Sequence, residues 1–152
     1  MKTTNYKLLA ISFFAVIIVA VFGSLFTQTN TSWYQENKPS ITPQNYVFPI
    51  AWTTLYILIA LSIYFAFTKA NKKQKSKLIL LFASNLILNA VWTPLYFALK
   101  NPVLAFIDII LILITTILLI KYIYKINKKS SYLLIPYLLW LGFATILNYL
   151  SI

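Results

Sequence analysis

Five stretches of about 20 predominantly apolar residues dominate this sequence of 152 residues. A helix rises about 1.5 Å per residue, so each stretch is long enough to cross the roughly 30 Å hydrocarbon core of a bilayer. The stretches cover residues 8–27, 49–68, 78–99, 103–120 and 132–152. Together they take up about two-thirds of the chain, which leaves no room for a soluble domain. We therefore expect an all-α integral membrane protein in which residues 1–152 form one bundle of five transmembrane helices.

The charge balance fits a membrane protein better than a nucleic-acid-binding protein. Charged residues make up 10% of the chain, against about 25% in an ordinary soluble domain. Thirteen lysines and two acids give a formal net charge of +11, a value that alone would suggest a nucleic-acid partner. However, 61% of the residues are hydrophobic, and arginine, the usual side chain for phosphate and base contacts, is absent. We therefore expect a lipid bilayer as the surrounding partner, and no nucleic acid.

Several reactive residue types are missing from the chain. It contains neither cysteine nor histidine, which excludes disulfides, thiolate nucleophiles, imidazole catalysis and the usual zinc and haem ligands. The two acids, Glu36 and Asp108, lie far apart in the sequence and leave little for hydrolytic chemistry. We expect no metal site, no required cofactor and no conventional catalytic constellation.

The lysines indicate how the chain is oriented in the membrane. Counted on alternate sides of the five stretches, eleven fall on the side of the amino terminus and only Lys38 and Lys100 on the other. Positive charges concentrate in cytoplasmic segments. We therefore expect a cytoplasmic amino terminus, an outward-facing carboxyl terminus and a multi-pass location in the cell membrane. A cleavable signal peptide is the alternative for the first stretch, but that run exceeds the usual h-region of roughly 7 to 15 residues.

The connections between the stretches carry further signals. The lysine-rich segments 69–77 and 121–129 are expected to be surface loops, and Asn101 followed by Pro102 is typical of a helix start. Prolines inside the third and fifth stretches are expected to kink their helices. The first outer loop, 28–48, is long and contains its own aromatic residues and prolines, which favours a functional or packed loop over an idle one.

Aromatic and amide side chains recur at helical spacing in three of the stretches. These stripes are Trp52, Tyr56, Ala60 and Tyr64 in the second stretch, Asn85, Asn89, Trp92 and Tyr96 in the third, and Tyr137, Trp140, Ala144 and Asn148 in the fifth. Such stripes have three interpretations: hydrogen bonding between helices, an aromatic belt at the membrane surface, or a ligand pocket between helices.

The expected depth of the tryptophans helps to separate these interpretations. Trp92 lies about 21 Å and Trp140 about 12 Å from the cytoplasmic end of its stretch, too deep for a surface belt. Trp52 lies only about 5 Å from the outer end and could belong to that belt. We predict a pocket that opens toward the outer half of the bundle, with the loop containing Trp33 above it as a lid.

Asp108 is the only acid inside a stretch, about 8 Å below the outer end of the fourth helix. Acids within the membrane are candidates for a functional role. The alternative is a structural role, because the nearby helix amino terminus favours a negative charge and Lys100 is close in sequence.

Four blocks of sequence resemble one known family. They are Trp33-Tyr34 with Lys38-Pro39 and Pro43, VFPIAWTTLY at 47–56, LILNAVW at 86–92 and PYLLWLGFATILNY at 136–149. Together they resemble the translocator protein or tryptophan-rich sensory protein family, also called peripheral-type benzodiazepine receptors. The resemblance covers all five stretches.

The resemblance implies a five-helix bundle, usually a homodimer, that binds porphyrins, haem-related tetrapyrroles and hydrophobic drugs beneath the first loop. The residues that fall on its pocket positions are Trp52, Tyr56, Asn89, Trp92, Trp140, Ala144 and Leu147. Trp33 and Trp140 fall on tryptophans that some bacterial members need for light- and oxygen-dependent porphyrin breakdown, and are the candidate catalytic residues. The chain departs from the family at Pro43-Gln44, where a Pro-Pro pair is common. No basic residue follows Tyr149, so cholesterol recognition through that pattern is not expected.

The expected function is therefore a membrane receptor for porphyrins and other hydrophobic ligands, with possible photo-oxidative porphyrin degradation and tetrapyrrole or stress signalling. Any such chemistry would be driven by the ligand. Two alternatives stay open: a transporter of tetrapyrroles or other hydrophobic molecules, and a membrane-organising protein whose aromatic residues only pack.

Overall fold

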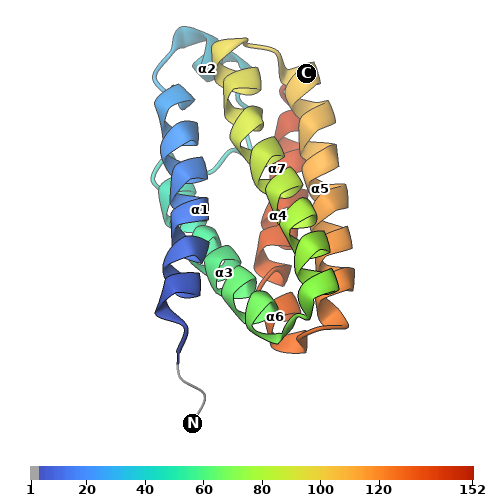
Figure 1. Ribbon diagram of the computed structural model, residues 1–152. Coiled ribbons are helices and arrows are strands. Elements are labelled where there is room, and N and C mark those ends of the chain that lie inside the picture. Colours follow the sequence, from blue (N-terminus) through green and yellow to red (C-terminus); the bar gives the residue numbers. More distant parts are fainter. Residues whose placement is uncertain (1–3) are drawn as a thin grey trace.

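A computed structural model describes residues 4–152, and this part of the chain is all-helical (Figure 1). Five helices are long and apolar enough to cross a membrane: Tyr6–Phe26, Val47–Lys69, Lys72–Ala98, Pro102–Tyr124 and Lys128–Tyr149. The prediction of five candidate membrane-spanning helices is thus confirmed.

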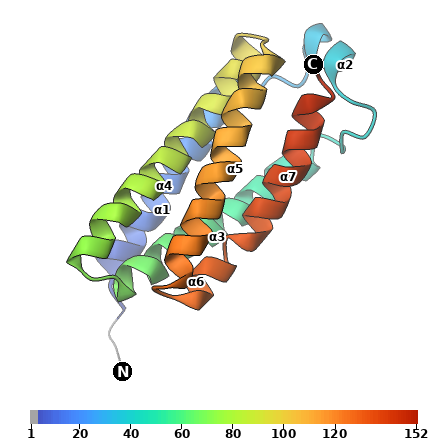
Figure 2. The same cartoon turned by 90° about the vertical axis from the view of Figure 1, so that its right-hand side faces the viewer.

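The long helices are α1 (Tyr6–Phe26), α3 (Val47–Lys69), α4 (Lys72–Thr93), α5 (Pro102–Tyr124) and α7 (Ile135–Tyr149). Two short helices, α2 (Ser32–Asn37) and α6 (Lys128–Tyr132), lie at opposite ends of the bundle (Figures 1 and 2). The end that carries α2 also holds the carboxyl terminus, and α1 begins near the end that carries α6. Because the number of spans is odd, the start of the first span and the end of the last span lie at opposite ends of the bundle.

Asparagine side chains begin most of these helices. Asn101 Oδ1 accepts a hydrogen bond from the backbone N–H of Leu104 at 3.0 Å, and Pro102 occupies the first turn of α5, as its sequence predicted. Asn71 and Gln74 form a reciprocal capping box at the start of α4. The expectation of a loop over 69–77 is therefore wrong, because this cap starts the helix among the lysines.

The lysines at 121–129 also depart from the expected loop. Lys121 lies in the last turn of α5, and Lys128 and Lys129 lie in α6. The Asn127 side chain accepts hydrogen bonds from the backbone N–H groups of Lys129 and Ser130 and so caps α6. Only a short connection between the two helices is left as a loop.

The fifth span is not one continuous helix, because Leu133 and Leu134 separate α6 from α7. Pro136 therefore lies in the first turn of α7 and does not kink a helix interior. Ser62 of α3 and Ser130 of α6 each donate a hydrogen bond to the other's backbone carbonyl, at 2.9 and 2.6 Å, which fixes α6 against α3.

Pro94 interrupts the third span without ending it. The five residues Pro94–Ala98 form a π-helical turn, η1, in which the N–H of Leu99 donates to the carbonyl of Pro94 at 2.9 Å. Proline has no N–H to give to the helix, and a single π turn is a common way for a helix to accommodate such a break. The turn carries Tyr96 and Phe97 to the outer end of the bundle.

Candidate ligand-binding site

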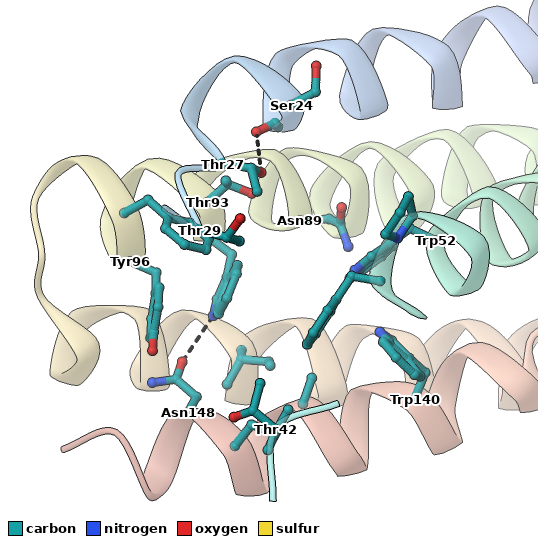
Figure 3. A pocket seen from close by; sticks show the side chains of 18 of the residues that line it. Ser24, Thr27, Thr29, Thr42, Trp52, Asn89, Thr93, Tyr96, Trp140 and Asn148 are labelled. Carbon is teal, nitrogen blue, oxygen red and sulfur yellow. Dashed lines mark hydrogen bonds between the residues drawn. The ribbon is translucent and has the colours of Figure 1, made fainter. Parts of the chain in front are cut away.

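A cavity of about 590 Å³ lies between the helices and reaches the first loop (Figure 3). Its walls come from α1, α3, α4 with η1, α5 and α7, and residues 29–45 of the loop region contribute to its outer end. Most of the lining is apolar or aromatic, with amides and hydroxyls at intervals. This volume and composition are typical of sites for small molecules.

All seven residues that the family resemblance placed at pocket positions line this cavity. They are Trp52, Tyr56, Asn89, Trp92, Trp140, Ala144 and Leu147. The structure brings them together from α3, α4 and α7, the three helices whose stripes share a period of about four residues. Trp33 is different, because it is not part of the lining.

Asn89 is the polar centre of the cavity wall. Its Oδ1 accepts a hydrogen bond from the Tyr56 hydroxyl at 2.8 Å, and its Nδ2 donates to the Tyr137 hydroxyl at 3.0 Å. This amide therefore joins α3, α4 and α7 while it is only 7% exposed. One N–H of the amide is left for a further acceptor.

Asn85 lies one turn deeper on α4 and completes the hydrogen-bonded chain. Its Nδ2 donates to the hydroxyls of Thr115 and Thr116 on α5, both at 2.9 Å. Its Oδ1 accepts from the Tyr137 hydroxyl at 3.3 Å. The interhelical hydrogen bonds that the two asparagines predicted are thus present. Asn89 belongs to the cavity lining, whereas Asn85 lies outside it.

Trp92 is fixed by two neighbours. Its indole N–H donates to Asn148 Oδ1 at 3.0 Å, the bond that ends as a dashed line at Asn148 in Figure 3. Its ring stacks on Tyr96 with centroids 5.0 Å apart and planes 14° apart. The Tyr96 hydroxyl in turn donates to Ser151 Oγ at 2.9 Å. Trp92 therefore presents a rigid aromatic surface to the cavity, with its polar edge already used.

Trp52 and Trp140 keep their polar edges free. Within residues 4–152 neither indole N–H has a hydrogen-bond partner, although both rings line the cavity. Trp52 packs against Tyr56 with centroids 5.3 Å apart, and Trp140 meets Phe48 edge-on at 6.0 Å. A ligand with acceptor atoms could use both N–H groups.

The first loop covers the outer end of the cavity through α2. Trp33 packs edge-on against Tyr96 at 5.5 Å, and Tyr34 packs against Phe97 at 5.6 Å. Tyr34 also lines the cavity, and burial, together with the nearby Tyr96, raises the pKa of its hydroxyl. Tyr34 is therefore a neutral phenol at neutral pH. Trp33 itself does not line the cavity, but it packs against Tyr96, which does.

Asp108 lies in α5 and is 5% exposed. Its Oδ2 atom is buried and has no hydrogen-bond partner among residues 4–152. Asp108 does not belong to the cavity lining, whereas Ile109 and Ile112 of the same helix do. Its position therefore separates it from the ligand site.

Sequence reasoning missed the contribution of α1. Ala20, Gly23, Ser24 and Thr27 line the cavity on that side, and a Cβ atom added at Gly23 would lie 3.4 Å from Thr93 Oγ1. The available signal was the spacing of these small residues by three or four positions, which places them on one face of an otherwise bulky helix where another helix can approach closely.

These features define a multi-pass membrane protein whose helices enclose an aromatic cavity with a few polar groups. The chain matches the sequence pattern of the TspO/MBR family over residues 11–151. It is 41% identical to the tryptophan-rich protein TspO of Archaeoglobus fulgidus over 95% of each chain. It is 36% identical to the tryptophan-rich protein TspO of Bacillus cereus over 91% of each chain, and 29% identical to the translocator protein of Homo sapiens over 77% of this chain and 71% of that protein. The chain therefore belongs to the TspO/MBR family.

Proposed function

We propose that this protein is a membrane receptor that binds porphyrins or related tetrapyrroles in the cavity. The observation that carries the proposal is the convergence of three indole rings and the Asn89 amide on a single space within the bundle. Flat aromatic surfaces suit a planar conjugated ligand. Family membership supports the same conclusion.

The side chains divide the recognition between them. Trp92, with its N–H bonded to Asn148, offers a stacking face, whereas Trp52 and Trp140 offer both a ring and a free N–H. Asn89 offers its remaining amide N–H to a polar edge of the ligand. Ala144 and Leu147 leave room between the rings.

Porphyrin breakdown would follow from this binding. The ligand absorbs the light, so the protein needs to supply only an electron-rich neighbour. Trp140 lies in the cavity wall and can touch the ligand. Trp33 packs against Tyr96 and does not line the cavity, so we assign it a supporting role and no direct contact with the ligand.

We also propose the orientation and setting of the receptor. Among residues 4–152, all lysines except Lys38 and Lys100 belong to the end that carries α6, and this charge asymmetry supports a cytoplasmic location for that end in the cell membrane. The cavity then opens beneath the outer loop. Family membership supports a homodimer.

Protoporphyrin binding to the purified protein in lipid nanodiscs tests the proposal. We expect quenching of tryptophan fluorescence and a dissociation constant that rises about tenfold in Trp140→Phe and in Asn89→Ala, because each change removes one contact. Ile87→Ala, on the lipid-facing side of α4, is the control and should bind like the parent protein. Unchanged affinity in both cavity variants would contradict the assignment. Binding no tighter than to empty nanodiscs would favour a protein that only organises the membrane.

A transporter of tetrapyrroles or other hydrophobic molecules is the second candidate, and the unpartnered Oδ2 atom of Asp108 favours it. A carrier coupled to ions needs a charge within the membrane. If the protein is such a carrier, Asp108→Asn should abolish tetrapyrrole flux into proteoliposomes while leaving equilibrium binding unchanged. Unchanged flux in this variant, or no flux in the parent protein, would remove the support for coupled transport.

A further inference from the structure

Lys38 is the only charged side chain among the described residues that line the cavity. It follows α2 as its C-cap residue, is exposed, and lies at the outer end of the cavity where the first loop meets the bundle. A charge at this position is unusual for the chain, because almost all of its lysines belong to the opposite end. The positive-inside pattern therefore does not account for it.

Thr42 adds a second polar group to the same part of the lining. The backbone N–H of Thr42 donates to the carbonyl of Pro39 at 3.0 Å, so one tight turn follows Lys38 and ends at Thr42. Both residues line the cavity, and Thr42 is among the side chains drawn around it in Figure 3. Thr42 Oγ1 is buried and has no hydrogen-bond partner among residues 4–152. A buried hydroxyl without a partner is destabilising unless a ligand or water supplies one.

No acid is placed to neutralise this corner from within the cavity. The chain has two acids, and neither Glu36, which is exposed on α2, nor Asp108, which is buried in α5, belongs to the lining. A lysine, an unpaired hydroxyl and the free N–H groups of Trp52 and Trp140 leave the cavity rich in donors. Such a cavity suits a ligand that carries negative charge at one edge.

We propose that the Lys38–Thr42 turn is a binding site for a carboxylate, so that the cavity selects tetrapyrroles with acidic side chains over neutral analogues. The inference rests on the proposed porphyrin-binding function and adds the class of ligand and its orientation. The conjugated ring lies among the tryptophans, and its carboxylates point outward to the Lys38 ammonium and the Thr42 hydroxyl. Because Lys38 is exposed, this contact lies at the mouth of the cavity, where the charge-assisted hydrogen bond rather than burial supports it.

The test compares protoporphyrin, which has two carboxylates, with its dimethyl ester, which has none, in nanodiscs of neutral phosphatidylcholine. Empty nanodiscs correct for partition into lipid. We expect the acid to bind the parent protein about tenfold more tightly than the ester. In Lys38→Met this preference for the acid should fall to about twofold or less, while the affinity for the ester stays unchanged. In Thr42→Val the preference for the acid should be about threefold smaller than in the parent protein.

Lys100→Met is the matched control, because it removes the other lysine of the same side without touching the cavity. It should retain the full preference for the acid. An equal affinity for acid and ester in the parent protein, or an unaltered preference in Lys38→Met, would overturn the carboxylate site while porphyrin binding itself stands. If neither compound binds better than to empty nanodiscs, the proposed function fails instead.

Discussion

Replacing Ala144 by phenylalanine is expected to weaken protoporphyrin binding at least a hundredfold. Ala144 lies one turn from Trp140 and one turn from Asn148 on the face of α7 that lines the cavity. A phenyl ring at this position occupies space in the cavity that the proposed ligand fills. A hundredfold change corresponds to about 2.7 kcal/mol of binding free energy. Fluorescence quenching in nanodiscs measures it directly.

Two further variants make this result specific. Ile146→Phe places the same ring on the exposed side of α7, where Ile146 is 53% exposed, and should leave the affinity unchanged. Ala144→Gly keeps the cavity open and should bind within about threefold of the parent protein. If Ala144→Phe binds protoporphyrin normally, the ligand lies somewhere other than in this cavity.

The second large effect is on stability. Replacing Asn85 by leucine should lower the free energy of unfolding by about 2 kcal/mol, because it removes the bonds to Thr115, Thr116 and Tyr137 at roughly 0.6 kcal/mol or more each. For a chain of this size that loss corresponds to a melting temperature about 4 to 8 °C lower. Thermal unfolding in detergent micelles measures the shift. Leucine fills a similar volume, so lost packing contributes little.

A double-mutant cycle with Thr115→Val isolates the hydrogen bond to α5. In the parent protein Thr115→Val should lower the free energy of unfolding. In the Asn85→Leu background the same substitution should lower it less, because the bond between the two side chains no longer exists. Equal effects in both backgrounds, or a melting temperature of Asn85→Leu at or above that of the parent protein, would show that this polar chain does not hold α4 against α5.

The fold was largely predictable because the bilayer imposes a length on each helix. The stretch expected at 49–68 appears as α3, Val47–Lys69, and the one expected at 78–99 continues into η1 as far as Ala98. The helix limits were less predictable. Helices continue beyond the hydrocarbon wherever a cap such as Asn71 allows it, and composition alone does not separate a lysine-rich helix end from a lysine-rich loop.

The cavity was predictable where a periodic stripe marked it. Trp140, Ala144 and Asn148 recur every four residues, so one face of α7 had to carry them, and the structure places all three in the lining. Trp52 shows the limit of depth arguments. A position near the membrane surface suited an aromatic belt, but the direction of its side chain into the cavity depends on the rotation of α3.

Long-range contacts of the loop could not be inferred from the sequence. Trp33 was expected above the pocket, but it packs against Tyr96, which a π turn carries outward after Pro94. The break at Leu133 and Leu134 was hidden for a similar reason. Both residues are apolar, and the bonds that hold α6 to α3 join Ser62 to Ser130, which lie 68 residues apart.

The distribution of hydrogen bonds among the helices also sets an order for assembly during synthesis. The hydroxyls of Ser12, Ser24 and Thr27 bond to carbonyls of α1, so this helix enters the lipid needing nothing from those that follow. By contrast, α4 arrives with amide and indole N–H groups whose acceptors lie on α7, a helix that is made later. A chain that stops early therefore leaves these groups unpaired in hydrocarbon. The wall of the cavity is therefore completed only when α7 has joined the earlier helices.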